Sequence, residues 1–371
     1  MWTVVNLVDR FCDRYDFFVV ARNYDGREDP TPYTEVKTAD WNTVGNARVY
    51  YISDEMLGMR AIQRLIREVA PDAIFLNSYF ATPSVILYFL RFLGIDRDIP
   101  LILAPCGNLS ERSIGLKPLK KRSFIFLSRL LGLQKGVIWK ATSDLEVKEI
   151  EAAMGKQAAF LVAPDLPPLS ILPDLSVEQK PRKEKGNVRL IFISRVVKKK
   201  NLDLLLTSLL PLTEGNITLD IVGPLEEKRY WEQCRSIIDQ LPENIKVNVV
   251  GGVPYQEGLQ YLVNSHFMVL PTLNENFGYV FIEAMSAGCP LLVSEGTTIW
   301  NDLEPTGTGW NLPLDEPEIW SDRIRSCCAM DADQFSAMSI KARERADAWL
   351  SDPKIEEATA SVLEFALNSR K

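Results

Sequence analysis

Short, almost purely apolar runs recur along the chain, and each is followed by a polar turn and a segment with helical spacing of its apolar residues. Uninterrupted apolar runs of this length are typical of strands in a parallel sheet that is covered by helices on both faces. Their alternation with helical segments predicts repeated right-handed β-α-β units. The expected strands are 16–21, 73–76, 99–104, 136–142, 188–194, 217–223, 245–251, 266–271 and 289–294.

A stretch rich in proline and then in charge divides this alternation into two halves. No periodic pattern crosses it, so we interpret residues 166–187 as an interdomain linker. With 371 residues the chain suits two domains of ordinary size. The expected fold is α/β, with two doubly wound Rossmann-like domains over residues 1–165 and 188–350. The last helical segment, 351–371, either stays on the second domain or crosses back to the first, and the pattern leaves both open.

Composition excludes several classes of function. The net charge of -7 argues against nucleic acid as the main partner, because nucleic-acid-binding surfaces are usually basic. The six cysteines form no C-x-x-C pair, which disfavours a disulfide framework or a zinc site and fits a reducing cytoplasm. His266 is the only histidine, which excludes a multi-histidine metal centre. The apolar run 73–90 divides into a strand, a polar turn and a helix, so we do not interpret it as a membrane span.

The segment "NENFGYVFIEAMSAG" (274–288) predicts an anion site at a helix start. A helix is expected from about Tyr279, and Gly278 before it can adopt backbone angles closed to other residues. The free amides at such a start carry the positive end of the helix dipole and suit a diphosphate. Glu275 and Glu283 would repel phosphate, so they are better suited to accept hydrogen bonds from sugar hydroxyls.

A second signal lies upstream, in "ISRVVKKKNLDLLL" (193–206). Arg195 leaves a strand at its carboxyl end, where α/β sheets bind ligands, and Lys200 precedes a helix that we expect Asn201 to cap. A guanidinium and an ammonium converging there would clamp a diphosphate and stabilise its departing charge. Taken alone, the adjacent Lys198, Lys199 and Lys200 would indicate only a solvated basic turn. The glycine-containing anion site downstream favours the interpretation that they help to bind a diphosphate.

These segments carry a family resemblance. The runs at 194–206, 221–224, 249–254 and 271–294 follow in the order seen in family-four retaining glycosyltransferases of the GT-B fold, the group 1 glycosyltransferases. The two glutamates separated by seven residues, with an internal Phe-Gly, are specific to that pattern. The resemblance covers the whole second half and extends more weakly into the first, as in "PDAIFLNSYF" (71–80).

The resemblance implies a nucleotide sugar, linked to UDP or GDP, as donor and a glycan or lipid-linked glycan as acceptor. It implies retention at the anomeric carbon, no cofactor and no metal, with catalysis by electrostatic stabilisation and positioning. The expected activity is that of a hexosyltransferase in polysaccharide biosynthesis, with the first domain on the acceptor side. The implied catalytic residues are Glu275, Arg195 and Lys200, and the implied donor-binding residues are Arg195, Lys200, Gly252, Val253, Glu275, Asn276, Phe277, Gly278, Tyr279 and Glu283.

The first half departs from the family in two places. Relatives begin with a strand and a glycine-rich loop, whereas "WTVVNLVDRFCDRY" (2–15) resembles the helix that follows that loop. The first strand and loop are therefore expected to be missing. Many relatives also carry a histidine where this chain has Asn77 and Ser78, which can hydrogen-bond a sugar but cannot act as a base.

Two alternative functions stay open at this point. A glycoside hydrolase could use Glu275 and Glu283 as paired carboxylates, although the basic pair suits phosphate, which hydrolases do not bind. A catalytically impaired glycosyltransferase-like protein could bind a nucleotide or a partner without turnover, which the missing strand and loop favour.

Residues 112–140 have a charge unlike that of the rest of the chain. They contain eight basic residues and no acidic one, around an apolar run at 123–133. A basic amphipathic element on an acidic protein can lie on an anionic membrane, although a core-facing helix with a basic rim gives the same pattern. The expected location is therefore cytoplasmic, with peripheral contact at the inner face of a membrane as the alternative.

Overall fold

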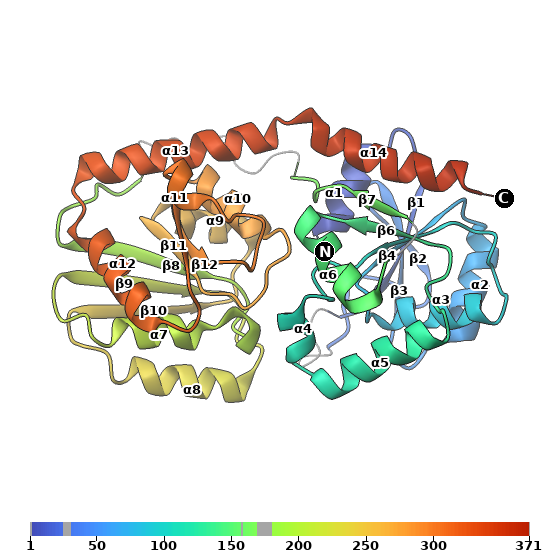
Figure 1. Cartoon of the computed structure of the whole chain (residues 1–371), viewed down its shortest axis with the longest axis horizontal. Helices are drawn as coiled ribbons and strands as arrows, with labels where there is room; N and C mark the ends of the chain where they lie inside the picture. Colours follow the sequence, from blue (N-terminus) through green and yellow to red (C-terminus); the bar gives the residue numbers. More distant parts are fainter. Residues whose placement is uncertain (1, 25–30, 157–158, 169–179, 371) are drawn as a thin grey trace. The chain divides into compact units, whose positions relative to one another are not determined.

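The computed structural model describes residues 2–24, 31–156, 159–168 and 180–370 of the chain. The chain divides into two compact units, Met1–Leu169 with Pro353–Lys371 as unit 1 and Ser170–Asp352 as unit 2. Much of the linker predicted at 166–187 falls on residues 169–179, which lie outside the described residues. The fold is α/β with two Rossmann-like domains, as the alternation of apolar runs and helical segments predicted (Figure 1).

Unit 1 contains two sheets. The strands β1, β3 and β2 form the first in that order, with β1 parallel and β2 antiparallel to β3, and β4 to β7 form a parallel sheet in chain order. Its elements are α1 (Trp2–Phe11), β1 (Phe17–Arg22), β2 (Trp41–Val44), β3 (Ala47–Ile52), α2 (Met59–Val69), β4 (Ile74–Asn77), α3 (Thr82–Phe92), β5 (Leu101–Ala104), α4 (Glu111–Gly115), α5 (Pro118–Leu130), β6 (Val137–Ala141), α6 (Asp144–Met154), β7 (Phe160–Val162) and α14 (Pro353–Asn368).

The last helix, α14, belongs to unit 1 although unit 2 precedes it in the chain. Its apolar face, with Val362 and Ala366, packs against Ile102 and Ile138 of the parallel sheet. Ion pairs with α1 support it, from Arg10 to Glu356 at 2.9 Å and from Arg14 to Glu364 at 2.7 Å. Of the two placements that the sequence left open, the structure shows the return to the first domain.

Unit 2 is a six-stranded parallel sheet in the order β10-β9-β8-β11-β12-β13. Helices cover both of its faces, with α7, α8 and α12 on one and α9, α10 and α13 on the other (Figure 1). Its elements are β8 (Asn187–Ile193), the 3-10 turn η2 (Lys198–Lys200), α7 (Leu202–Leu209), β9 (Asn216–Val222), α8 (Lys228–Ile238), β10 (Ile245–Gly251), α9 (Tyr255–Val263), β11 (Phe267–Leu270), α10 (Tyr279–Ser286), β12 (Leu291–Ser294), α11 (Leu303–Thr306), β13 (Gly309–Leu312), α12 (Pro317–Ala329) and α13 (Ala332–Leu350).

Two strands of unit 2, β11 and β12, are buried along their whole length, as the unbroken apolar runs predicted. Every residue of β11 and β12 is buried, because helices cover both faces of the sheet. Short strands escaped prediction, namely β2, β3, β7 and β13. The strands β2 and β13 are short and contain polar residues, whereas β3 and β7 contain the short apolar runs VYYI and FLV that the sequence analysis did not assign to strands.

Among the described helices, none combines the length and the apolar character that a membrane span requires. The run 73–90 forms β4, a turn and the helix α3, as the sequence predicted.

Candidate functional site

The predicted donor-binding residues of unit 2 lie in loops at the carboxyl ends of neighbouring strands. Arg195 and Lys200 follow β8, Gly252 and Val253 follow β10, and Glu275 follows β11. Because β8 pairs with both β9 and β11, these loops meet at one edge of the sheet. The carboxyl edge of an open α/β sheet at such a point is where ligands usually bind.

Lys200 and Glu275 form an ion pair in this structure. Their side chains are only 11% and 20% exposed, so the pair is largely shielded from water. The backbone joins the same two loops, since the amide of Leu273 donates to the carbonyl of Lys199 at 2.9 Å. The loop of Glu275 is held from its other side by the bond from the Glu275 amide to the Thr297 carbonyl, at 2.8 Å. Ammonium and carboxylate are therefore fixed side by side.

Arg195 also faces a carboxylate, that of Glu226 after β9, with Nη1 and Oε2 3.1 Å apart. The Arg195 side chain is 60% exposed, so it can turn toward a ligand at small cost. The sequence analysis did not identify Glu226. The run "GPLEE" directly after the strand at 217–223 was the signal that could have revealed it, because it is an acidic group at a strand end.

Gly278 begins the helix α10 in a left-handed conformation, with φ 75° and ψ 74°. A Cβ at this position would lie 2.5 Å from the ring of Phe281 and 2.9 Å from Cγ of Glu275, so only glycine fits. The backbone amides of Phe277, Gly278 and Val280 have no hydrogen-bond acceptor among the described residues. The helix start that the sequence predicted is present, with free donors at the positive end of its dipole.

The two glutamates of the motif have opposite electrostatic environments. Burial alone would raise the pKa of Glu275, but the charges of Lys200, Lys199 and Arg195 outweigh it and lower that pKa below its ordinary value. Burial raises the pKa of Glu283 to about 7, and its hydrogen bond from the Tyr255 hydroxyl, at 3.1 Å, opposes only part of the rise. One carboxylate is therefore held ionised, while the other is close to half-protonated at neutral pH.

The turn after β10 approaches the turn after β9. Gly251 has a φ of 80°, and the amide of Gly223 donates to its carbonyl at 2.7 Å. A Cβ at Gly252 would be in ordinary contact with Pro224, at 3.7 Å. Gly252 and Val253, which follow β10, therefore lie beside the loop that follows β9 and carries Glu226.

The remaining predicted residues follow Glu275 in the chain. Asn276 is half-buried, and the ring of Tyr279 packs edge-on against Phe277 with centroids 5.0 Å apart. The expectation that Asn201 caps α7 through its side chain is wrong. Asn201 has a left-handed φ of 58°, and its side chain makes no capping bond. Such backbone angles aim the side-chain oxygen away from the helix start.

Unit 1 has a pocket of its own, with a volume of about 480 Å³. Asn77, Ser78, Asn108 and Lys121 are among its lining residues, at the carboxyl end of β4 and nearby. Ser78 has a positive φ of 83° and its hydroxyl bonds to Oδ1 of Asn108 at 2.5 Å, whereas the buried Oδ1 of Asn77 has no partner among the described residues. An unpartnered buried acceptor in a polar pocket suits a ligand hydroxyl.

No group of three or more histidine, cysteine or acidic side chains within the described ranges could hold a metal ion. His266 is buried, with Nδ1 accepting from the Arg189 amide at 3.0 Å and Nε2 3.2 Å from the Pro181 carbonyl. Burial lowers its pKa to about 4. It is a neutral structural group in the core of unit 2.

Comparisons with known proteins agree with this geometry. The family described as "Glycosyl transferases group 1" matches residues 176–345, which contain all of the predicted donor-binding residues. Residues 176–345, somewhat less than half of the chain, are similar to the group 1 glycosyltransferases. The match covers the region whose strand ends carry Arg195, Lys200, Glu275 and Glu283.

The individual proteins to which the chain is similar are distant. It is 22% identical over 187 residues to the putative colanic acid biosynthesis glycosyltransferase WcaL of Escherichia coli, which is 48% of this chain but only 45% of that relative. It is similar in fold to sucrose-phosphate synthase from Thermosynechococcus elongatus, with a TM-score of 0.75 and 16% identity over 99% of this chain and 93% of the other. HepE from Anabaena, solved in complex with UDP and glucose, has a TM-score of 0.67 and 16% identity over 98% and 95%. These two likenesses show the GT-B fold.

Proposed function

We propose that this protein transfers a sugar from a nucleotide diphosphate donor to a hydroxyl of a glycan or lipid-linked glycan, with retention at the anomeric carbon. The observation that carries the proposal is the meeting of Arg195, Lys200 and the free amides of α10 at one edge of the sheet of unit 2. Together they offer cationic and amide donors to a diphosphate, the group that must accept negative charge as the glycosidic bond breaks.

The ion pair between Lys200 and Glu275 suggests how the donor enters. A diphosphate that binds Lys200 replaces Glu275 as its counter-ion, and the released carboxylate can then accept hydrogen bonds from hydroxyls of the transferred sugar. The ammonium is never left unpaired in this exchange, so its burial costs little. In this proposal Glu275 positions the sugar, and Arg195 and Lys200 stabilise the departing diphosphate.

Glu283 and the turn at Gly252 and Val253 complete the donor site. We assign the ribose hydroxyls to Glu283, whose carboxylate already accepts a bond from Tyr255, and the base to the turn after β10. Asn276, Phe277, Gly278 and Tyr279 would contact the sugar or the phosphates. The complex of the structurally similar HepE with UDP and glucose supports UDP as the first nucleotide to test.

Calorimetric titration with UDP and with GDP tests the donor site, since a ligand of the folded state also raises the unfolding temperature. Turnover is then measured with UDP-sugars and GDP-sugars, and the anomeric configuration of the product by NMR. Binding without turnover would favour a catalytically impaired protein, and release of sugar from glycosides without nucleotide would favour a hydrolase. If neither nucleotide binds, the proposed function is wrong.

We assign the acceptor to unit 1, where the pocket at the end of β4 has the polar character that hydroxyls require. We also propose that this chain lacks the first strand and glycine-rich loop of the family's N-terminal domain, as the family resemblance led us to expect. Among the described strands, β1 pairs only with β3, and β4 pairs only with β5. Each of these two strands therefore has an open edge. Turnover of this chain compared with one extended at its amino terminus tests whether such a strand matters for activity.

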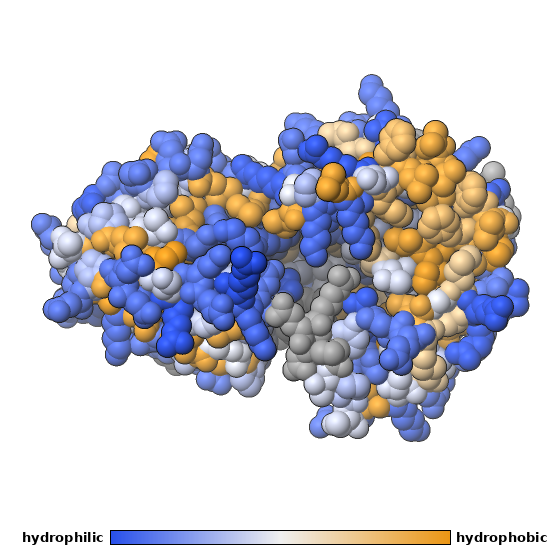
Figure 2. Space-filling model, turned by 90° about the horizontal axis from the view of Figure 1, so that it is seen from below, coloured by the Kyte–Doolittle hydropathy of each residue, from blue (hydrophilic) through white to orange (hydrophobic). Residues whose placement is uncertain are grey.

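We propose that residues 112–140 contact an anionic membrane surface, which places the protein at the inner face of a membrane. Leu119, Phe126 and Leu130 on α5 are 86%, 69% and 71% exposed. The exposed basic side chains of Lys120 and Arg122 accompany them. Figure 2 shows apolar side chains gathered on unit 1 in the view from below. Apolar insertion together with basic charge is the pattern of an interfacial helix.

Flotation with vesicles of phosphatidylglycerol and of phosphatidylcholine at low salt tests this contact. The protein should float with the anionic vesicles, and Phe126→Glu with Leu130→Glu should abolish flotation. Ile340→Glu is the matched control, because Ile340 is a 46% exposed apolar residue on a helix of unit 2. Equal flotation of the double variant and the control would refute the contact.

A further inference from the structure

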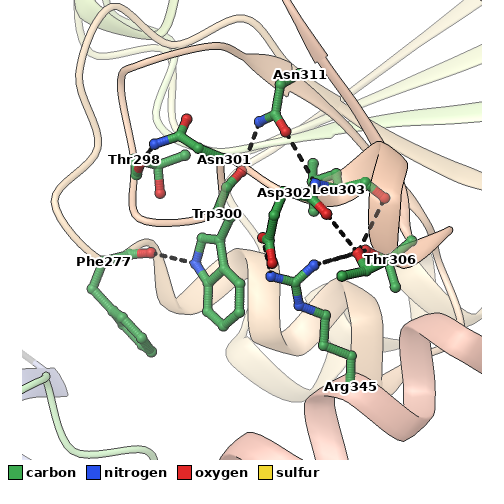
Figure 3. Close-up of polar contacts among 10 residues, drawn as sticks. Phe277, Thr298, Trp300, Asn301, Asp302, Leu303, Thr306, Asn311 and Arg345 are labelled. Atoms are coloured by element: carbon green, nitrogen blue, oxygen red, sulfur yellow. Dashed lines mark hydrogen bonds and ion pairs between the residues drawn. The ribbon is translucent and has the colours of Figure 1, made fainter.

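The indole of Trp300 reaches the loop that carries the anion site. Trp300 lies between β12 and α11 and is 2% exposed. Its Nε1–H donates to the carbonyl of Phe277 at 2.9 Å (Figure 3). That carbonyl belongs to the peptide unit that joins Phe277 to Gly278, directly before α10. The bond therefore fixes one end of a peptide plane at the predicted phosphate-binding helix start.

Fixing this carbonyl also fixes the amide of Gly278. A trans peptide is planar, so its C=O and N–H point in opposite directions. With the Phe277 carbonyl held by Trp300, the Gly278 amide must point away from the indole. That amide has no acceptor among the described residues. Gly278 has φ 75°, a conformation that glycine can leave easily, so the direction of its amide depends on an external restraint.

The position of Trp300 is itself tightly determined. The guanidinium of Arg345 lies over its ring, 5.2 Å from the centroid, and pairs with Asp302 (Figure 3). The side-chain amide of Asn311 donates to the Trp300 carbonyl at 2.6 Å. Trp349 packs against the indole with ring centroids 5.0 Å apart. A tryptophan restrained on its backbone and on its ring cannot rotate to release the Phe277 carbonyl without breaking several contacts.

We infer that Trp300 is a positioning residue for donor binding, which orients the Phe277–Gly278 peptide so that the Gly278 amide is presented to the donor diphosphate. The inference rests on the proposed function for its ligand, whereas the positioning itself is a property of the unliganded protein. Arg345 and Trp349 both lie on α13, so this helix supports the loop that carries Phe277 and Gly278 through its contacts with Trp300.

Trp300→Phe tests the inference, because it removes the N–H donor and keeps an aromatic ring. Trp320→Phe is the matched control. Trp320 is also fully buried in unit 2, and its Nε1–H donates to the carbonyl of Pro313 at 2.6 Å, in a loop that carries none of the predicted site residues. Both variants lose one hydrogen bond from a buried indole and the same side-chain volume, so a merely structural role predicts similar effects for both.

The first measurement is hydrogen–deuterium exchange of the unliganded proteins. Trp300→Phe should speed exchange of the Phe281 amide, which donates to the Gly278 carbonyl at 2.9 Å, about tenfold relative to Trp320→Phe, because an unrestrained Gly278 lets this bond open more often. The second is titration with UDP and GDP, in which Trp300→Phe should weaken the Kd about tenfold and Trp320→Phe should leave it unchanged.

The outcomes separate the two claims. If exchange of the Phe281 amide is the same in both variants, Trp300 does not position this peptide and the inference is overturned. It is also overturned if exchange changes while the Kd of a nucleotide that binds the wild type does not. If the wild type binds neither nucleotide, the proposed function fails, and accelerated exchange in Trp300→Phe alone would still establish the positioning.

Discussion

The opposite pKa shifts of the two motif glutamates make a quantitative prediction about pH. Burial raises the pKa of Glu283 from 4.5 to about 7. Between these two values the unfolded chain has lost the proton that the folded protein keeps, so folding stability falls as pH rises. A shift of this size corresponds to about 3 kcal/mol, which is fully lost above the folded pKa. The side chain is buried, so little of this effect is screened by solvent.

Glu283→Gln isolates this contribution, because glutamine keeps an acceptor for the Tyr255 hydroxyl but cannot ionise. At about pH 5 the variant and the wild type should unfold at similar temperatures, since Glu283 is then protonated. At about pH 8 the variant should be more stable by about 3 kcal/mol, which corresponds to roughly 6 to 12 °C in the unfolding temperature of unit 2. Differential scanning calorimetry of both proteins across this range provides the measurement, and the difference between them cancels other titrating groups.

Glu275→Gln is the control, because the pKa of Glu275 is shifted in the opposite direction to that of Glu283. The lowered pKa of Glu275 means that its stabilisation is present above its ordinary pKa and is lost only as pH falls through the folded value. Its variant should therefore differ from the wild type by a constant amount between about pH 5 and pH 8. A flat difference for Glu283→Gln over the same range would refute the burial argument.

The proposed donor site leads to further predictions. Lys200→Ala should weaken UDP or GDP binding about 10- to 100-fold in calorimetry, because it removes a charge-assisted contact, while Lys198→Ala, at an exposed neighbour paired with Asp203, should not. Equal losses in both variants would show that only the local charge matters. Gly278→Ala should lower the unfolding temperature and abolish nucleotide binding, since the added Cβ meets Phe281 at 2.5 Å and φ is 75°. Wild-type behaviour of that variant would disprove the requirement for glycine.

The sequence predicted the fold and the grouping of the loops that carry Arg195, Lys200 and Glu275 at one sheet edge, because both follow from short-range patterns. Apolar runs identify buried strands, and Arg195, Lys200 and Glu275 directly follow such runs. The sequence did not predict which carboxylate each cation meets. Those pairs depend on the strand order, in which β8 lies between β9 and β11, so that Glu226 and Glu275 approach from opposite neighbours.

Trp300 was missed for a related reason. It lies outside the motif, and only the tertiary structure brings its indole to the Phe277 carbonyl, 23 residues away in sequence. A buried tryptophan carries no sequence signal for the acceptor of its single donor. The pKa of Glu283 could not be read from its neighbours in sequence either, because burial by the surrounding fold causes the shift.

The exposed pair between Arg195 and Glu226 leads to a last prediction, in which removing a carboxylate improves binding. Glu226 is 31% exposed and lies 3.1 Å from Arg195, so the pair contributes at most about 1 kcal/mol. A diphosphate must displace or repel this carboxylate, whereas Glu226→Gln leaves Arg195 free to bind. The variant should therefore bind UDP or GDP up to about fivefold more tightly at low salt, with the gain shrinking as salt screens the charge. Calorimetry at two salt concentrations measures both effects. A weaker affinity would mean that Glu226 orients Arg195 for the donor instead of competing with it.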